Sequence, residues 1–117
     1  MKDAPESHLP LTPAVFHILL ALADGDRHGY AIAREVAERT DRTVRLGPGT
    51  LYGTLTRLLD AGLIEEGKPA ASRKGADDER RRYYRLTRIG RLVAKAEARR
   101  LASLVAVARD KALLTDR

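Results

Sequence analysis

The clearest pattern in this chain of 117 residues is GTLYGTLTRLLDAGLI, at residues 49–64. Its leucines recur at the spacing that lines one face of a helix, at Leu51, Leu55, Leu58 and Leu59. The opposite face is small, hydroxylic and cationic, with Tyr52, Gly53, Thr56 and Arg57. Arginine can bind a guanine edge with two hydrogen bonds, hydroxyls can reach bases or phosphates, and glycine permits close approach. We therefore interpret this segment as a helix that enters the major groove of DNA, the alternative being an ordinary amphipathic helix.

Residues on either side of this helix predict where it starts and ends. Residues 46–49, Leu-Gly-Pro-Gly, form a turn cluster, and Thr50 is positioned to cap the helix. Gly62 supplies a left-handed stop, after which Leu63 and Ile64 open an extended segment. A helix that runs directly into a strand in this way is the central part of a winged helix-turn-helix.

The remaining elements complete that fold. Thr12 and Pro13 begin a nearly wholly apolar first helix, which ends before Asp24-Gly25. A second helix starts at residues 27–30, and its buried stripe is expected to consist of Tyr30, Ala33, Val36 and Ala37. The fold class is therefore mostly α with a small β-hairpin (α+β), a winged helix-turn-helix followed by a long C-terminal dimerisation helix.

Alternation of side chains predicts the two strands of the hairpin, which are joined by a loop over residues 67–80 that forms the wing. In the second strand, residues 80–86, Tyr84 and Leu86 are expected on one face and Tyr83 and Arg85 on the other. Thr87 then caps a last helix that runs to about Leu114.

The formal net charge of +6 is concentrated around this wing. Residues 68–91 hold nine basic and three acidic residues, which accounts for the whole excess. Such a local excess is typical of an element that contacts phosphates, although a solvated charge run is the alternative. The predicted DNA-binding residues are Thr50, Tyr52, Gly53, Thr56, Arg57, Lys68, Arg73, Lys74, Arg80, Arg81 and Arg82.

The last helix carries two apolar stripes that are rotated relative to one another. Ile89, Leu92, Val93 and Ala96 share one face, and the second stripe begins at Leu101. We expect the first stripe to pack on its own domain and the second on another copy of the chain, the alternative being a helix folded wholly onto its own core. The predicted dimerisation residues are Leu11, Val15, Leu101, Leu104, Val105 and Ala108. The expected organisation is a disordered lead-in (1–10), a DNA-binding domain (11–87) and a dimerisation helix (88–117).

Several classes of function are disfavoured by composition. The chain has no cysteine and three irregularly spaced histidines, so we expect no metal site and no cofactor. It lacks the patterns of nucleophile, base and phosphate-binding loop that indicate an enzyme. Its N-terminus has no apolar run, so a cytoplasmic protein without membrane contact is expected. The expected partners are double-stranded DNA and a second copy, and the competing hypothesis is a winged-helix module that binds protein or RNA.

A set of motifs in this order resembles the PadR family of bacterial transcriptional regulators. The resemblance covers roughly residues 11 to 92 and rests on His28-Gly29-Tyr30-Ala31-Ile32, Gly49-Thr50-Leu51-Tyr52 through Leu55, Arg57-Leu58, Gly62-Leu63-Ile64, Arg82-Tyr83-Tyr84-Arg85-Leu86-Thr87 and Gly90. It implies a winged-helix domain, a homodimer built through the first and last helices, and repression of a nearby gene until an effector releases the operator.

Two features of the sequence differ from the family pattern, and the effector is not identified by the residues. Gly53 stands where the family commonly has proline, and residues 77–79 place acidic groups in the wing. Some compact relatives bind flat aromatic or drug-like molecules between their subunits. This chain has no tryptophan and a single phenylalanine, Phe16, which we expect in the core. Two alternatives therefore stay open: the effector is small or aliphatic, or the protein responds to no small molecule. The sequence does not identify effector-binding residues.

Overall fold

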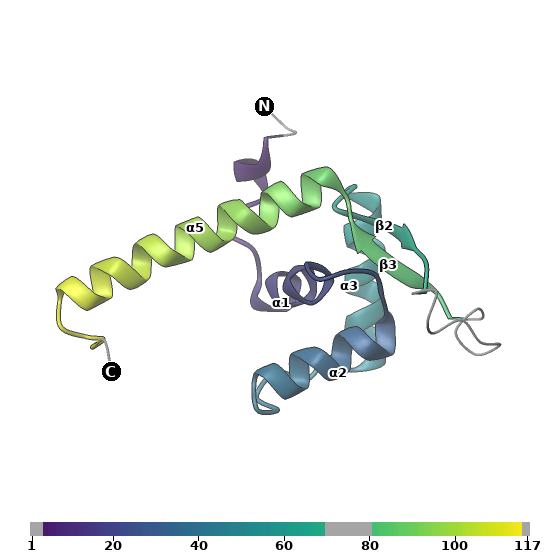
Figure 1. Cartoon of the computed structure of the whole chain (residues 1–117), viewed down its shortest axis with the longest axis horizontal. Coiled ribbons are helices and arrows are strands. Elements are labelled where there is room, and N and C mark those ends of the chain that lie inside the picture. Colours follow the sequence, from purple (N-terminus) through teal and green to yellow (C-terminus); the bar gives the residue numbers. More distant parts are fainter. Residues whose placement is uncertain (1–3, 70–80, 116–117) are drawn as a thin grey trace.

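The computed structural model describes residues 4–69 and 81–115. Its elements are η1 (Pro5–His8), α1 (Pro13–Leu22), β1 (Arg27–His28), α2 (Gly29–Arg39), α3 (Pro48–Asp60), β2 (Ile64–Gly67), β3 (Tyr83–Leu86) and α5 (Arg88–Asp110). Figure 1 shows α1, α2 and α3 grouped beside a small sheet, with the long α5 passing over α1 and projecting beyond the group. The predicted fold class, mostly helical with a small β part, is confirmed.

One hydrophobic core joins the helices to the sheet. Thr12 caps α1 as expected, since its Oγ1 accepts a hydrogen bond from the Val15 amide at 3.2 Å. The buried core is formed by Ile18, Leu19, Ala21, Leu22, Ile32, Val36, Leu51, Leu55, Leu58, Leu63, Ile64, Tyr84 and Val93. Every element from α1 to α5 except the short β1 contributes to it, so α3 and the sheet are held at a fixed relative position.

Helix α3 begins earlier than the sequence suggested. Its N-cap is Gly47 and Pro48 is its first residue, so Thr50 lies inside the first turn and makes no cap. The prediction of Thr50 as the cap was therefore wrong, because proline at the first helical position starts the helix upstream of it. The stop was predicted correctly: Gly62 has φ +76° and the Leu63 amide donates to the Leu58 carbonyl at 3.0 Å.

The sheet has three antiparallel strands in the order β1-β3-β2 rather than the two strands of a simple hairpin. The additional strand β1 pairs Arg27 with Tyr84 and His28 with Tyr83. Tyr83 and Tyr84, predicted on opposite faces of the strand, are both buried. The ring of Tyr83 packs edge-on against that of His28 in β1, with 5.3 Å between the ring centroids. Tyr30 in α2 is 64% exposed, so its predicted place in the buried stripe was wrong; Ile32 and Val36 fill that stripe.

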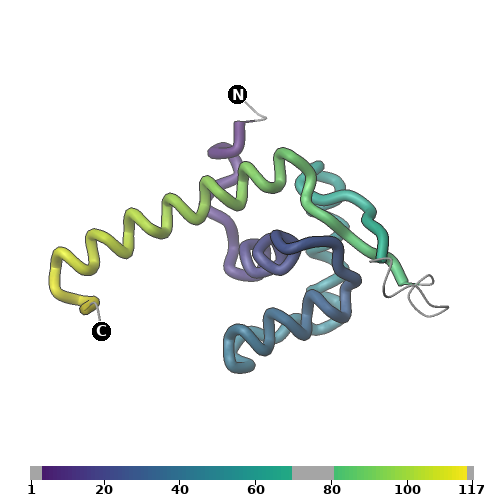
Figure 2. Tube along the Cα trace, viewed as in Figure 1, coloured from purple at the N-terminus to yellow at the C-terminus, as the bar shows by residue number. Residues whose placement is uncertain are grey.

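Helix α5 leaves β3 after one residue. Thr87 caps it as predicted, since Oγ1 accepts from the Gly90 amide at 3.0 Å. Its first half packs on α1, β3 and η1, and Figure 2 shows its second half projecting away from the rest of the described chain. The helix ends at Asp110 rather than near Leu114. Residues 4–10, expected to be disordered, include η1, which packs on α5.

A buried carboxylate ties the N-terminal segment to α5. Glu97 is only 2% exposed and its Oε2 accepts a hydrogen bond from the Leu11 amide at 3.0 Å. Arg100, one turn further along α5, donates to both carboxylate oxygens of Glu97. These hydrogen bonds, above all those from Arg100, hold the pKa of Glu97 below its usual value, and its burial opposes them.

Candidate nucleic-acid interface

The polar face of α3 is exposed as the sequence predicted. Tyr52 is 49% exposed, and Thr56 and Arg57 are exposed one turn along the same helix. The Thr56 hydroxyl donates to the Tyr52 carbonyl at 2.9 Å, and Arg57 Nη2 donates to the Thr54 hydroxyl at 3.1 Å. Each side chain keeps further hydrogen-bonding capacity, because a hydroxyl can also accept and a guanidinium has five N–H groups.

Gly53 leaves an open surface in the middle of this face. A Cβ at this position would have only Arg57 Nη1 nearby, at 3.8 Å. Thr50 is exposed in the first turn of α3. The predicted residues of α3 are therefore accessible together: four of them are exposed, and the half-buried Gly53 has open space above it.

The base of the wing is anchored to the turn between α1 and β1. The backbone amide of Lys68 donates to Asp26 Oδ2 at 2.9 Å, and the Lys68 side chain is exposed. Directly before β3, Arg81 and Arg82 are exposed, and Arg82 pairs with Glu66 at 3.3 Å. The predicted residues Arg73, Lys74 and Arg80, with the acidic residues 77–79, lie outside the described residues.

A pocket connects the helix to the wing base. It has a volume of about 470 Å³ and is lined by Tyr30, Tyr52, Arg81, Arg82 and Tyr84. The structure thus brings together three predicted residues, Tyr52, Arg81 and Arg82, from distant parts of the sequence. It adds Tyr84, and also Tyr30, which had been predicted to lie in the buried stripe of α2. Burial raises the pKa of Tyr84, so this hydroxyl stays protonated at neutral pH.

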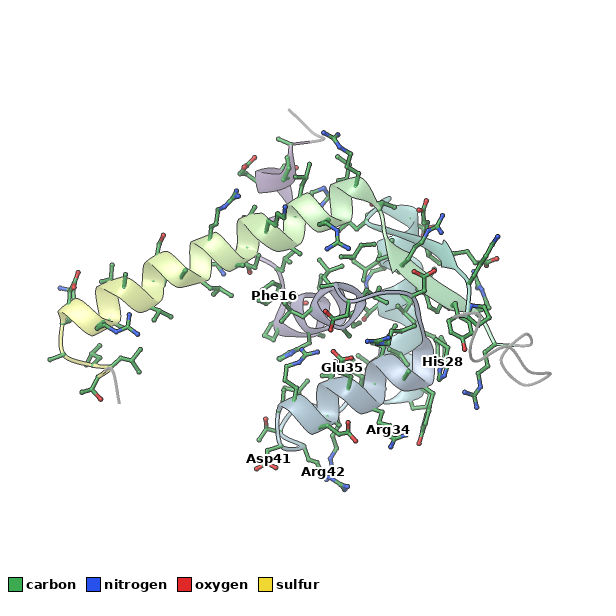
Figure 3. The ribbon with its side chains drawn as sticks, in the orientation of Figure 1. Phe16, His28, Arg34, Glu35, Asp41 and Arg42 are labelled. Carbon is green, nitrogen blue, oxygen red and sulfur yellow. The ribbon has the colours of Figure 1, made fainter. Side chains whose placement is uncertain are left out.

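The start of α2 is packed tightly against α3. The ring of His28 caps α2, since its Nδ1 accepts from the Ala31 amide at 3.1 Å. Gly29 is buried, and a Cβ there would lie 2.7 Å from the Tyr52 hydroxyl oxygen. A side chain at this position would therefore push the Tyr52 ring away from its place against α2. Figure 3 shows His28 at the end of α2 nearest the sheet.

The predicted dimerisation residues fall into two groups. Leu11 and Val15 are half-buried and pack against the core of their own chain. Leu104 and Val105 are 55% and 42% exposed on the projecting half of α5, flanked by the half-buried Leu101 and Ala108.

Phe16 does not occupy the place that its apolar character suggested. The side chain is half-buried on α1 (Figure 3) and lies outside the core cluster, which corrects its expected assignment to the core.

Within residues 4–69 and 81–115, no group of three or more histidine, cysteine or acidic side chains is placed to hold a metal ion. None of the helices in these ranges combines the length and the apolar content that a membrane crossing requires.

Comparison with known proteins gives a consistent result. The model of the transcriptional regulator PadR-like family matches residues 18–96. A transcriptional regulator of Mycobacterium tuberculosis is 35% identical over 88 residues, 75% of this chain and 75% of that protein. An uncharacterized 37.1 kDa protein in a transposon of Streptomyces fradiae is 40% identical over 87 residues, 74% of this chain but only 22% of its own length.

Solved structures share the fold. A PadR family transcription regulator from Clostridium difficile superposes with a TM-score of 0.66 at 26% identity, over 82% of this chain and 94% of the other. Bacillus subtilis PadR, in a complex with operator DNA, gives a TM-score of 0.61 at 23% identity, over 74% of this chain and 46% of that one. The resemblance carried by the sequence motifs is thereby confirmed.

Proposed function

Because the chain belongs to the PadR-like family of transcriptional regulators, we propose that it is a repressor that binds an inverted-repeat operator as a homodimer. Membership in this family makes the chain a DNA-binding transcriptional regulator and not an enzyme. In this proposal residues 11–87 bind DNA, residues 88–117 supply the dimer contact, and a small-molecule effector releases the operator.

One observation carries the DNA-binding part of the proposal. The exposed polar face of α3 lies beside the basic base of the wing, and Tyr52 shares a pocket with Arg81 and Arg82. A helix of this composition supplies contacts to base edges, while neighbouring arginines supply contacts to phosphates. These two kinds of contact are the ones that a sequence-specific operator complex requires.

A binding experiment tests this assignment. We expect the full chain to bind a duplex from its own upstream region more tightly than random DNA in a gel shift. Arg57→Ala should weaken operator binding by about 1 to 3 kcal/mol and reduce the difference in affinity between operator and random DNA. Arg99→Ala is the control, because Arg99 is an exposed arginine on α5, away from the α3 face. Equal losses of operator affinity in Arg57→Ala and Arg99→Ala would show that α3 does not recognise the DNA sequence.

The dimer part of the proposal is supported by the projecting half of α5. Exposed contiguous leucine and valine side chains on one helix face are typical of a surface that packs against a partner. A two-fold dimer carries two recognition helices to successive major grooves. We therefore expect an inverted repeat whose half-sites are separated by about one helical turn, roughly 34 Å, or a multiple of it.

Repression itself is tested by transcription. Expression of the protein should lower transcription from a promoter that contains the operator, and deletion of its gene should raise it. Lower transcription on deletion would contradict the repressor role while leaving DNA binding intact.

A further inference from the structure

Three of the four tyrosines of the chain line one pocket together with two arginines. We call this site, made of Tyr30, Tyr52, Tyr84, Arg81 and Arg82, the tyrosine–arginine pocket. Its side chains come from the first turn of α2, from α3, and from β3 with the two residues that precede it. Hydroxyl and guanidinium groups that converge from three elements match the hydrogen-bonding needs of a phosphate group, which offers several acceptor oxygens and a negative charge.

Arg81 has hydrogen-bond donors available for such an anion. Its Nη1 lies 2.8 Å from His28 Nε2, while His28 Nδ1 accepts from the Ala31 amide. A neutral imidazole has one acceptor nitrogen and a protonated imidazole has none. The helix cap and the Arg81 contact therefore cannot both be hydrogen bonds to the same ring. An anion in the pocket would supply Arg81 with an acceptor without disturbing the cap.

Arg82 is held at the pocket by two contacts on one face of the sheet. Its guanidinium lies 5.6 Å from the centroid of the Tyr84 ring and pairs with Glu66. Glu66 is opposite Tyr84 in the register of β2 and β3, so the three side chains share a face. A guanidinium placed in this way meets a ligand with less loss of side-chain freedom than an unsupported one.

We propose that the tyrosine–arginine pocket binds one phosphodiester of the DNA backbone, at the strand between the groove entered by α3 and the base of the wing. This inference rests on the proposed function and deepens it. It assigns a role to Tyr30, whose ring is exposed at the start of α2 although the sequence pattern had placed it in the core. The same chemistry would also suit a free phosphate compound, which an experiment with inorganic phosphate distinguishes from the DNA backbone.

The test replaces single phosphodiesters by uncharged methylphosphonates along a duplex that the full chain has selected from random sequence. At one position in each half-site, the substitution should lower the affinity of the wild-type protein for the duplex about tenfold, as measured by fluorescence anisotropy. Tyr30→Phe and Arg82→Gln should each weaken binding to the unmodified duplex. In both variants the same methylphosphonate should lower the affinity by a smaller factor than in the wild type, because the contact between the pocket and this phosphodiester is already weakened.

Arg85→Gln is the matched control. Arg85 lies on β3, is paired with Glu65 at 2.9 Å as Arg82 is with Glu66, and points to the other face of the sheet. It should leave the methylphosphonate profile unchanged, whereas Arg82→Gln should make the salt slope shallower by about 0.9. Thermal unfolding of each variant shows whether the fold is retained.

The outcomes separate the two proposals. If the wild type selects no duplex, the proposed function fails and the phosphodiester site fails with it. If the wild type binds its duplex and the profiles of Tyr30→Phe and Arg82→Gln match that of the wild type, the pocket proposal is overturned and the proposed function stands. Saturable binding of inorganic phosphate, measured against chloride at equal ionic strength and lost in Arg82→Gln, with no sensitive phosphodiester, would assign the pocket to a free phosphate compound instead.

Discussion

Gly90 lies in the first turn of α5, directly against the backbone carbonyl of Leu63, and a Cβ there would overlap that oxygen. Since backbone cannot move aside as a flexible side chain can, Gly90→Ala should lower the free energy of unfolding by about 3 kcal/mol. Urea unfolding measures the change. Gly53→Ala is the control, because a Cβ in the open middle of α3 should instead stabilise by about 0.5 to 1 kcal/mol. Equal stability of Gly90→Ala and wild type would contradict the close packing.

Glu97 should make the free energy of unfolding depend on pH in the acidic range. Its pKa in the folded protein is lowered from 4.5, mainly by Arg100. A carboxylate with a lowered pKa contributes stability that is present above its unfolded value and is lost as the pH falls through its folded value. Glu97→Gln should therefore cost about 1 to 2 kcal/mol at neutral pH, and this difference from wild type should shrink below pH 4.5. A difference that stays constant with pH would mean that the charge of Glu97 has no such role.

At the scale of the elements, the wing depends on a contact with the α1–β1 turn. Asp26 accepts a hydrogen bond from the Lys68 amide, directly after β2. Asp26→Ala should speed amide hydrogen exchange at Lys68 and lower stability by about 1 kcal/mol. Asp24→Ala serves as control, since Asp24 is exposed in the same turn. Unchanged exchange at Lys68 in Asp26→Ala would show that the wing base is held by other contacts.

Elements defined by local chemistry were predictable from sequence. The Thr12 and Thr87 caps, the leucine stripe of α3 and the Gly62 stop depend on residues close in sequence, and the structure confirms each. Strand β1 was missed because two residues are too few for alternation to be visible. Its presence decides that Tyr83 is buried.

The candidate site was only partly predictable for the same reason. The composition of the α3 face indicated nucleic-acid contacts, but the pocket depends on how α2, α3 and β3 meet, which no local pattern encodes. Glu97 shows the limit most clearly. A glutamate on a helix normally faces water, and its burial here depends on the amide of Leu11, 86 residues away.

The projecting half of α5 should determine whether the protein forms a dimer. Leu104→Glu with Val105→Glu places two charges on the exposed apolar face and should give a monomer at micromolar concentration in sedimentation experiments. That monomer should bind the inverted repeat much more weakly than the wild type does. Ser103→Glu, on the opposite side of the same helix, should leave the dimer intact. A double variant that remains dimeric would place the interface elsewhere.

Thr87 is the single residue between β3 and α5, and three hydrogen bonds of Thr87 fix this connection. Its amide donates to the Leu63 carbonyl at 3.1 Å, its hydroxyl donates to the Gly62 carbonyl at 2.6 Å and also accepts from Gly90. With 23 residues, α5 is a lever arm about 35 Å long. A rotation of α5 by about 1° about its far end displaces the end next to β3 by about 0.6 Å. The sheet and α3 would move together with that end. In the proposed dimer, contacts at the far end of α5 would therefore set the distance between the two copies of α3.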